Sequence, residues 1–403
     1  MGEWKDYKVA EVIEEISMGP FGSNIKVDNF IDSGVPVLNG SNLQGFKLNE
    51  DSFNYVSQEK ADSLGKANAH KGDVVITHRG TLGQIVYIPE ESKYNQYVIS
   101  QSQFRLKLNQ DIIRPDFFVY FFHTRLGQHR ILMNASQVGV PALARPTSTF
   151  KEVLVPVPSM DAQIKIMDIL HSLDDKIEVN RRINDNLEQQ AQALFKSWFV
   201  DFEPFKNGEF VESELGMIPK GWRVGKLGEI CNVFTGKKDV KQSQPIGLYP
   251  FFSCSPNHTY SNEYIYDGPS IIIAGNGSYT GRTSFYFGKF DLYQRTYACT
   301  IKEGFNEKII SFLYYMMKCL FEPVKMGGTR GSSIPYIVMN DIVLQKFALD
   351  NSLVEKYSDF AYNVMKQIQQ NNQESRRLAE LRDTLLPKLM SGELKVNEIE
   401  NRL

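Results

Sequence analysis

Two long segments with a strict alternation of four- and three-residue steps constrain the fold of this chain more than any other feature. The first begins at Ile166 and the second at Tyr357, and each keeps the spacing for nine steps. A period of about 3.5 residues is typical of a coiled-coil seam, because it keeps one stripe of side chains facing a partner helix. The sequence therefore predicts two helices that pair with each other. The alternative is two amphipathic helices, each packed on its own domain.

The residues of the two seams are mostly apolar, with polar steps at matching places. In the first helix they are Ile166, Leu170, Leu173, Ile177, Asn180, Asn184, Leu187, Ala191, Leu194 and Trp198. In the second they are Tyr357, Ala361, Val364, Ile368, Asn371, Ser375, Leu378, Arg382, Leu385 and Leu389. A buried Asn at a seam position costs stability but fixes the register. We therefore expect an antiparallel coiled coil in one alignment, with Pro387 kinking or ending the second helix.

The rest of the chain is an internal repeat of two halves. Each half has, in the same order, a tryptophan, a Gly-rich polar loop, a hydrophobic strand running into a second glycine loop, an aromatic-rich helical stretch and a Gly/Ser/Pro-rich loop. In the first half these lie at 4, 18–23, 72–83, 117–132 and 138–148. In the second half they lie at 222, 234–238, 268–277, 309–320 and 327–335. The β-branched, Gly-punctuated stretches read as strands. The predicted fold class is α+β, with two mixed α/β globular domains in a pseudo-twofold arrangement, separated by the two helices.

This pattern predicts six parts along the chain. They are a first globular domain at 1–158, a first helix at 159–200, a Pro/Gly-punctuated acidic linker at 201–220, a second globular domain at 221–349, a second helix at 350–392 and a tail at 393–403. At about 1.5 Å per residue, a helix of roughly 40 residues is about 60 Å long. Such a rod is long enough to hold two globular domains apart.

Composition excludes several classes of protein. The chain has 403 residues, of which 42% are hydrophobic and 23% charged, so it is neither disordered nor collagen-like. Its longest aromatic or aliphatic run, 117–122, is far shorter than the roughly 18 to 20 apolar residues of a membrane helix. No export signal opens the chain, and its four widely spaced cysteines are typical of reduced structural thiols. We therefore expect a cytoplasmic protein.

Charge is distributed unevenly along the chain. The formal net charge is -2, but residues 217–349 carry 15 Lys and Arg against 9 Asp and Glu, whereas residues 159–216 carry 6 against 12. This asymmetry favours a nucleic-acid-binding face in the basic block and a different role for the acidic one. A charge fluctuation with no partner explains the same counts, so charge alone leaves the function open.

The sequence carries no signature of catalysis or of nucleotide binding. Residues 275–283 resemble a phosphate-binding loop, but the glycines follow G-x-G-x-x-x-G and Arg282 stands where a P-loop has lysine at a different spacing. There is no H-E-x-x-H, no G-x-S-x-G and no Asn-Pro-Pro-Tyr or Asp-Pro-Pro-Tyr tetrapeptide of an amino-methyltransferase, and the six histidines lack metal-ligand spacing. We therefore expect no catalytic residue and no metal site.

Polar and basic side chains on glycine-containing loops are instead the candidates for contact with DNA. Arg and Lys read guanine or hold phosphates, Asn and Gln read adenine, and Gly lets the backbone approach closely. In the first half the candidates are Thr77, His78, Arg79, Thr81, Gln101, Gln103, Arg145 and Thr147. In the second half they are Lys237, Lys238, Lys241, Asn276, Ser278, Tyr279, Arg282, Gln294, Arg295 and Arg330.

Four near-formulaic segments complete the pattern, and with them the whole chain resembles the specificity subunit of a Type I restriction-modification system. They are PVP at 156–158 followed by Gln163, LFKSWFVDF at 194–202, ELGMIPKGW at 214–222 and LLPKLMSG at 385–392. One departure is that the second half has QKFAL at 345–349 where a V-P-x-P ending would fall.

The resemblance implies a division of labour with partner proteins. Each globular half would be a target recognition domain that reads one part of a split, asymmetric sequence in double-stranded DNA. The helices would fix the spacer and dock two modification subunits, which methylate adenine and recruit restriction subunits. S-adenosylmethionine, ATP and Mg would belong to those partners, and this chain would bind no cofactor. The alternatives are a stand-alone DNA-binding regulator, a nuclease with an unrecognised site, and a carbohydrate- or protein-binding scaffold.

Overall fold

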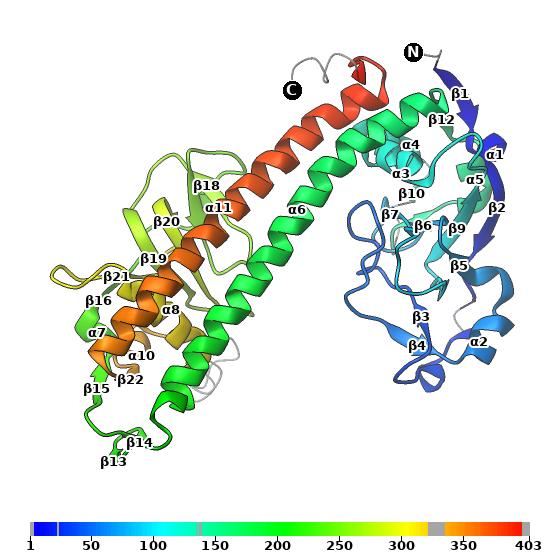
Figure 1. The fold of residues 1–403 in the computed structure, drawn as a ribbon. Coiled ribbons are helices and arrows are strands. Elements are labelled where there is room, and N and C mark those ends of the chain that lie inside the picture. Colours follow the sequence, from blue (N-terminus) through cyan, green and yellow to red (C-terminus); the bar gives the residue numbers. More distant parts are fainter. Residues whose placement is uncertain (1–3, 22–23, 134, 137–138, 321–334, 397–403) are drawn as a thin grey trace. The chain divides into compact units, whose positions relative to one another are not determined.

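The computed structural model describes residues 4–21, 24–133, 135–136, 139–320 and 335–396. Contacts divide the chain into a first unit, Met1–Lys176 with Arg377–Leu403, and a second unit, Ile177–Arg376. Each unit combines β-sheets with helices, so the predicted α+β class is confirmed (Figure 1). Both long helices contribute residues to both units, whereas the six predicted parts assigned them to neither globular domain.

The first unit contains two four-stranded sheets, with strand orders β2-β9-β6-β7 and β4-β3-β8-β5. Its elements are β1 (Lys5–Lys8), α1 (Val9–Val12), β2 (Ile13–Met18), β3 (Val35–Val37), β4 (Asn54–Val56), α2 (Gln58–Ser63), β5 (Asn68–His70), β6 (Val74–Thr77), β7 (Ile85–Tyr87), β8 (Gln96–Val98), β9 (Gln103–Leu108), α3 (Pro115–His123), α4 (Arg125–Leu132), β10 (Ala135–Ser136), β11 (Ala142–Leu143), α5 (Pro146–Lys151), β12 (Leu154–Val157) and the start of α6 (Met160–Phe195).

The core of the first unit lies between the β2-β9-β6-β7 sheet and α3. Strand β6 is buried along its whole length because it lies inside the sheet, and α3, in which five of nine residues are Phe or Tyr, is buried from Asp116 to Phe122. Leu170 of α6 and Leu389 of α11 (Asn351–Met390) join the same core. The packing of both long helices into this core fixes their ends to the unit.

The second unit is built around one six-stranded sheet, with strand order β16-β21-β19-β20-β17-β18. Its elements are β13 (Phe210–Ser213), β14 (Gly216–Pro219), β15 (Arg223–Lys226), α7 (Leu227–Ile230), β16 (Cys231–Thr235), β17 (Tyr249–Phe252), β18 (Thr259–Ser261), β19 (Tyr266–Ala274), β20 (Thr283–Leu292), β21 (Thr296–Ile301), α8 (Ile309–Leu320), α10 (Met339–Val343) and β22 (Lys346–Leu349), with the remaining parts of α6 and α11.

The core of the second unit repeats the arrangement of the first. The buried helix α8 packs on the sheet, and Phe195 of α6 and Tyr357 of α11 complete the same cluster. The sheets also correspond, because β2, β9 and β6 pair in the order in which β16, β21 and β19 pair, and the parallel pair β3 and β8 has a counterpart in β17 and β20. The internal repeat predicted from the sequence is therefore a repeat of the fold.

The seam predicted from the heptad spacing is the contact between α6 and α11, which run antiparallel and side by side (Figure 1). All twenty predicted seam residues are buried or half-buried. Asn180 is 1% exposed, and its Nδ2 donates to Glu374 at 2.8 Å. The Nδ2 of Asn371 donates to Asn184 Oδ1 at 2.8 Å. The polar steps of the two helices therefore meet, as the register argument requires.

The structure adds detail to three predictions about local structure. Helix α11 continues through Pro387 to Met390, so the proline does not end it, and a kink there stays a prediction. The aromatic-rich stretch 117–132 is two helices, because the Thr124 hydroxyl accepts the N–H of Gly127 and caps α4. The predicted linker contains the β13–β14 hairpin, and its Phe205 packs on Trp222. Among the residues that the structure describes, no helix is both long and apolar enough to cross a membrane.

Candidate nucleic-acid interface

The polar loops of the first unit meet at one end of its β2-β9-β6-β7 sheet, where β2 and β6 end and β9 begins. The Gly19 N–H donates to the Gln103 carbonyl at 2.8 Å, and the His78 N–H donates to the Ser102 carbonyl at 2.9 Å. The His78 carbonyl in turn accepts the Leu143 N–H at 2.8 Å. These bonds gather residues 17–21, 77–83, 100–103 and 141–147, which we call the first loop cluster.

A hollow of about 540 Å³ opens beside the first loop cluster. It is lined by Ser17, Met18, Gly19, Pro20, Phe21, Asn24, Ser63, Leu64, Lys66, Ala67, His78, Arg79 and Gln101. Three of the predicted DNA-contacting residues, His78, Arg79 and Gln101, therefore lie around one concave surface. The His78 Nε2 is 3.1 Å from the Gln101 carbonyl oxygen, and burial lowers the pKa of His78, so its imidazole is neutral at pH 7.

Two predicted residues of the first unit support the loops from within. Thr77 is 3% exposed and its hydroxyl donates to Gln84 Oε1 at 3.1 Å, while Gln103 is 1% exposed and its Oε1 accepts the Ser100 N–H at 2.9 Å. Both side chains are buried and bonded within the fold, so they support the loops, and their direct contact with DNA stays a prediction. Of the remaining candidates, Thr81 and Arg145 are exposed and Thr147 is half-buried.

The second unit gathers its loops at the corresponding end of its sheet. The Gly275 N–H donates to the Arg295 carbonyl at 3.0 Å, and the Gln294 N–H donates to the Lys238 carbonyl at 2.9 Å. We call residues 235–241, 253–256, 275–282, 293–296 and 335–337 the second loop cluster. Its exposed predicted residues are Lys237, Lys241, Ser278, Tyr279, Gln294 and Arg295. Asn276 is half-buried, and Arg330 lies outside the described residues.

The two loop clusters are built on the same backbone hydrogen bonds. The Gly80 N–H donates to the Pro141 carbonyl at 2.9 Å, and the Gly277 N–H donates to the Pro335 carbonyl at 3.1 Å. Both glycines have positive φ, 92° and 82°, which other residues adopt only with strain. The residue before each glycine forms an isolated antiparallel bridge to the residue after that proline. Arg79 and Asn276 therefore occupy one position of the repeat with different chemistry.

Two predicted contacts of the second unit are instead used inside the fold. The Lys238 Nζ lies 2.7 Å from Asp291 and 2.8 Å from Glu263. Burial acts to lower the pKa of Lys238, but its hydrogen bonds to these two carboxylates outweigh burial and raise it. The Arg282 guanidinium donates to the backbone carbonyls of Ser255 and, at 3.4 Å, Pro256. Both side chains hold the second loop cluster together, and their contact with DNA stays a prediction.

The Arg282 contacts have a counterpart in the first unit. There the Gln84 amide donates to the Gly40 carbonyl at 2.9 Å, on the segment that follows β3. Arg282 reaches the segment that follows β17, the strand corresponding to β3. Gln84 and Arg282 therefore occupy corresponding positions of the repeat, and each supports the segment after the corresponding strand, one with an amide and the other with a guanidinium.

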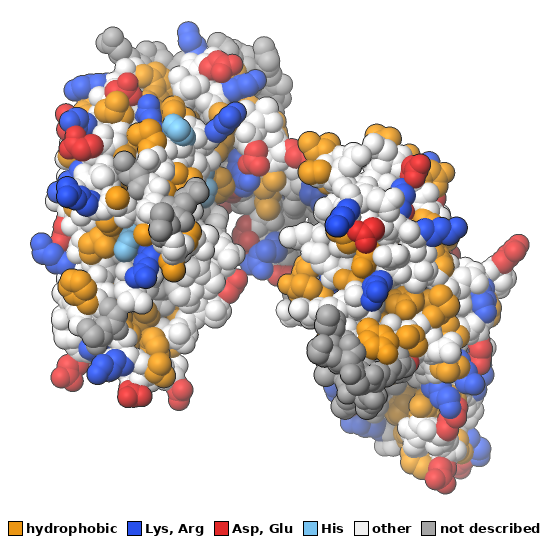
Figure 2. All heavy atoms as spheres, turned by 180° about the vertical axis from the view of Figure 1, so that it is seen from behind, with side chains coloured by type: hydrophobic (Ala, Val, Ile, Leu, Met, Phe, Trp, Pro, Cys, Tyr) orange, Lys and Arg blue, Asp and Glu red, His pale blue; other side chains and the backbone are white. Residues whose placement is uncertain are grey.

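Charge does not form a continuous basic patch on the face drawn in Figure 2. Basic and acidic side chains are interspersed there, with apolar side chains between them. On this face, single cations among acidic and apolar side chains, rather than one broad positive field, are offered to a polyanion.

Two residues of the first hollow were missed by the sequence reasoning. Phe21 is 84% exposed and lies on the Gly-rich loop at 18–23 that the repeat predicts. An aromatic residue between Gly19 and Gly22 could have been predicted from the sequence as an exposed contact residue. Lys66 comes, with Ser63, Leu64 and Ala67, from the end of α2 and the segment after it, far along the chain from the lining residues of the first loop cluster. No motif marks it, and only the tertiary structure brings it to the hollow.

A further hollow, of about 320 Å³, lies in the second unit where α11 faces the sheet. His258 lines it, with its ring centroid 5.4 Å from those of Phe252 and Tyr260. Burial, with a smaller contribution from the charge of Arg376, lowers the pKa of His258 to about 4. His258 is therefore neutral in the folded chain at pH 7.

The chain is similar to known proteins over most of its length. The family model for the Type I restriction modification DNA specificity domain matches residues 1–189 and 219–349. The chain is 27% identical to the Type I restriction enzyme MjaIX specificity subunit of Methanocaldococcus jannaschii, over 98% of this chain and 95% of that protein. It is 32% identical to the EcoDI specificity subunit of Escherichia coli, over 44% of this chain and 40% of that protein. The crystal structure of a Type I restriction-modification S subunit from M. genitalium has a similar fold, with a TM-score of 0.57, 18% identity and 96% of each chain covered.

Replacing Gly19 tests the close packing of the first loop cluster. A Cβ at this position would lie 1.9 Å from the Ser100 carbonyl oxygen, a backbone atom that cannot move aside cheaply. We expect Gly19→Ala to lower the free energy of unfolding by about 2 kcal/mol or more, measured by urea denaturation. Gly40→Ala is the control, because its Cβ would meet only Gln84 Oε1 at 3.6 Å. Equal stability of the two variants would contradict the packing described.

His258 predicts a pH dependence of stability. The unfolded side chain has a pKa of about 6.5, so as the pH falls the unfolded state binds the proton first and the folded state loses stability between about pH 6.5 and 4. Between pH 7.5 and 5.5 we expect wild type to lose about 1 kcal/mol more than His258→Phe, by urea denaturation. The same loss in both proteins would show that His258 does not titrate in this way.

Proposed function

Because the chain belongs to the Type I restriction-modification DNA specificity family, we propose that its two loop clusters read the two parts of a split DNA sequence. The chain is the DNA target specificity subunit of a Type I system, a recognition component that does not itself catalyse. The resemblance drawn from the sequence is thereby confirmed. Which residues read which base remains a proposal, and the loop clusters supply its basis.

The observation that carries this proposal is the shared backbone of the two clusters. Identical hydrogen bonds hold the loops that follow β6 and β19, while the side chains on them differ. A constant backbone with variable side chains presents two different sets of donors and acceptors in one geometry. Two such surfaces in one chain suit a DNA sequence with two unlike parts, because each unit reads its own part independently.

Arg79 and Asn276 are the residues that we assign first to base recognition. Arginine donates two parallel hydrogen bonds to guanine O6 and N7, and asparagine pairs in the same bidentate way with adenine N6 and N7. Arg79 is exposed beside the first hollow. Asn276 occupies the corresponding position of the second loop cluster, where it is half-buried and its Oδ1 accepts the Cys254 thiol at 3.1 Å, a bond that adenine would displace. The exposed cations Lys237, Lys241 and Arg295 serve the phosphate backbone.

The paired helices serve as the ruler between the two parts of the target. Helices α6 and α11 have 36 and 40 residues, which at about 1.5 Å per residue corresponds to roughly 54 to 60 Å. Successive accessible major grooves lie about 34 Å apart, so a rod of this length sets such a separation. The polar steps at Asn180 and Asn371 hold the helices in one register and thereby hold the spacer length constant.

The exposed faces of the helices also suit docking of partner subunits. Val179 and Ile183, one turn apart on α6, are 46% and 42% exposed and offer apolar surface to a partner. We assign this face to the modification subunits, two per complex, which recruit the restriction subunits. S-adenosylmethionine, ATP and Mg are then held by those partners, and double-stranded DNA in the cytoplasm is the ligand of this chain.

Mapping of methylated adenines in cells that co-express the chain with the modification subunit encoded beside it tests the proposal. A split motif with a fixed spacer is expected, and it disappears when this chain is omitted. Arg79→Ala should weaken or relax one part of the motif only, and Asn276→Ala the other part only. We expect a loss of about 5-fold to 100-fold in preference at one base pair in each case.

Lys93→Ala is the matched control, because Lys93 is an exposed cation of the first unit that does not line the hollow. It should leave the motif unchanged. If both Arg79→Ala and Asn276→Ala also leave it unchanged, the loop clusters do not read the bases. A complex that assembles without any methylation would favour a stand-alone DNA-binding regulator or a scaffold.

Replacing both Asn180 and Asn371 with Ile tests whether the paired helices α6 and α11 fix the spacer length. We expect the double variant to stabilise the helix pair, since buried polar groups at seam positions cost stability, and to loosen its register. The methylated motif should then include targets whose spacer differs from that of wild type. The thermal midpoint of the complex and the spacer lengths in the methylation map are the two measurements. An unchanged spacer would show that these residues do not fix the register.

A further inference from the structure

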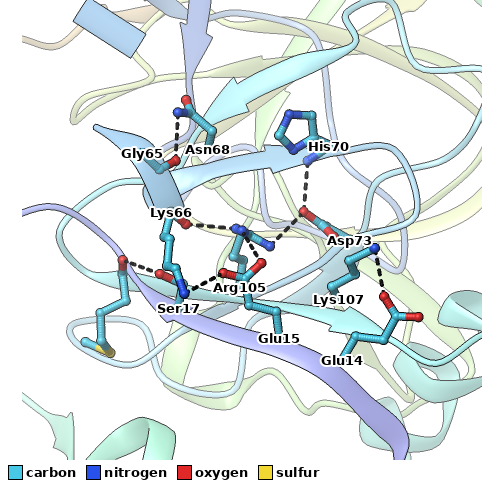
Figure 3. A network of polar contacts seen from close by, with 11 residues as sticks. Glu14, Glu15, Ser17, Gly65, Lys66, Asn68, His70, Asp73, Arg105 and Lys107 are labelled. Atoms are coloured by element: carbon cyan, nitrogen blue, oxygen red, sulfur yellow. Dashed lines mark hydrogen bonds and ion pairs between the residues drawn. The ribbon is translucent and has the colours of Figure 1, made fainter. Parts of the chain in front are cut away.

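A network of charged side chains meets the first hollow at Lys66, which belongs to both (Figure 3). Its centre is Arg105 on β9, whose side chain is only 7% exposed. The guanidinium lies between Glu15 of β2 and Asp73, with Nη2 at 3.0 Å from Glu15 Oε2 and Nη1 at 3.3 Å from Asp73 Oδ2. One buried cation therefore serves two carboxylates, an arrangement that is costly to build and strongly destabilising to break.

The network reaches the hollow through Lys66. The Arg105 Nε donates to the Lys66 backbone carbonyl at 2.9 Å, which fixes the backbone of the segment after α2. The Lys66 side chain is 80% exposed, and its Nζ is 3.4 Å from Glu15 Oε1. Lys66 thus has a backbone held by a buried group and an ammonium that stands in solvent beside the first hollow.

Glu15 shares its charge between the two cations. Burial acts to raise the pKa of Glu15, but the hydrogen bond and charge of Arg105 outweigh burial and lower it, so Glu15 is ionised at neutral pH. Its contact with Arg105 is shorter than its contact with Lys66. Since an exposed ion pair is weak, Lys66 exchanges Glu15 for a stronger anion at little cost.

We propose that Lys66 contacts a DNA phosphate at the first hollow, and that Arg105 is the residue that positions it. The proposal rests on the function proposed above, in which this hollow faces DNA. Arg105 fixes where the lysine leaves the backbone, and it offsets part of the charge of Glu15, so that Glu15 competes less for the Lys66 ammonium. Phe21, exposed on the same hollow, offers an apolar surface to the adjacent sugar or base.

The repeat supports a role confined to the first unit. The sheet register aligns Arg105 with Val75 and, in the second unit, Ala298 with Ile272, so Ala298 stands where the first unit has Arg105. The second unit therefore lacks this network. A structural device required by the fold itself would be expected in both copies, whereas a device for one DNA contact is needed in only one.

The test measures binding of the full chain, in complex with its modification subunits, to the duplex that carries the methylated motif and to a shuffled duplex. Fluorescence anisotropy between 50 and 200 mM salt gives the slope of log affinity against log salt. Lys66→Gln should weaken binding to both duplexes about fivefold and reduce the slope by about 0.9, the value for one phosphate contact, without changing the methylated motif.

Lys107→Gln is the matched control, because Lys107 lies on β9 two residues from Arg105 and pairs with Glu14 at 2.7 Å, but does not line the hollow (Figure 3). It removes one positive charge from the same unit, so it corrects for long-range attraction. If Lys66→Gln and Lys107→Gln change the slope equally, Lys66 makes no phosphate contact and the proposal is overturned. If Arg79→Ala weakens binding while Lys66→Gln does not, only this inference fails; if neither weakens it, the hollow does not face DNA.

Arg105→Lys tests the positioning role, because it keeps the buried charge but cannot donate to Lys66, Asp73 and Glu15 together. We expect the same loss of slope as in Lys66→Gln, and no further loss when the two are combined. Binding like wild type would overturn the positioning role. Should Arg105→Lys fail to fold, Glu15→Gln replaces it: it should strengthen binding more than Glu14→Gln does, and an equal effect of the two would overturn the sharing of Glu15.

Discussion

The packing of α6 against α11 through an apolar seam interrupted by polar steps is the constraint on which the rest of the structure depends. Apolar seam residues supply the driving force, and they leave many sliding alignments open because one apolar step resembles the next. Asn180 and Asn371 remove that freedom, since any other alignment leaves a buried amide without a partner. Each unit is then attached to both helices by its own core, in which Leu170 and Leu389, or Phe195 and Tyr357, pack on a buried aromatic helix.

Carboxylates on α6 form hydrogen bonds with tyrosines of the buried helices α3 and α8. In the first unit Asp174 accepts the Tyr120 hydroxyl and pairs with Arg382 of α11 at 2.6 Å. In the second unit Glu188 accepts the hydroxyl of Tyr315 at 2.9 Å and that of Tyr314 at 3.2 Å. Burial and the neighbouring carboxylate both raise the pKa of these tyrosines, so they remain donors at any physiological pH. The orientation of each helix is therefore set by polar contacts and its depth by apolar ones.

On this scaffold the loops of the two units share a backbone and differ in side chains. The path of each loop is set by a glycine with positive φ whose N–H donates to a proline carbonyl, and the repeat preserves both features. The charged residues behind the loops differ: Arg105 pairs with Glu15 and Asp73 in the first unit, and Lys238 pairs with Asp291 and Glu263 in the second. Recognition of two unlike DNA sequences requires this combination, because the geometry of approach stays the same while the chemistry presented to the DNA changes.

The sequence by itself determined the seam, the repeat, the α+β class and the family, because each follows from local periodicity or from a contiguous motif. Every predicted seam residue is sheltered from solvent, since a heptad spacing fixes which side of a helix each residue occupies. The candidate site was only partly predictable. His78, Arg79 and Gln101 line one hollow, as their loops suggested. The side chains of Thr77, Gln103, Lys238 and Arg282 instead bond to other residues of the fold. Lys66 and Phe21, which line the same hollow, were not among the predicted residues. Whether a polar side chain faces solvent or a buried partner depends on strand register and on residues far away in the chain, and only the tertiary structure decides that.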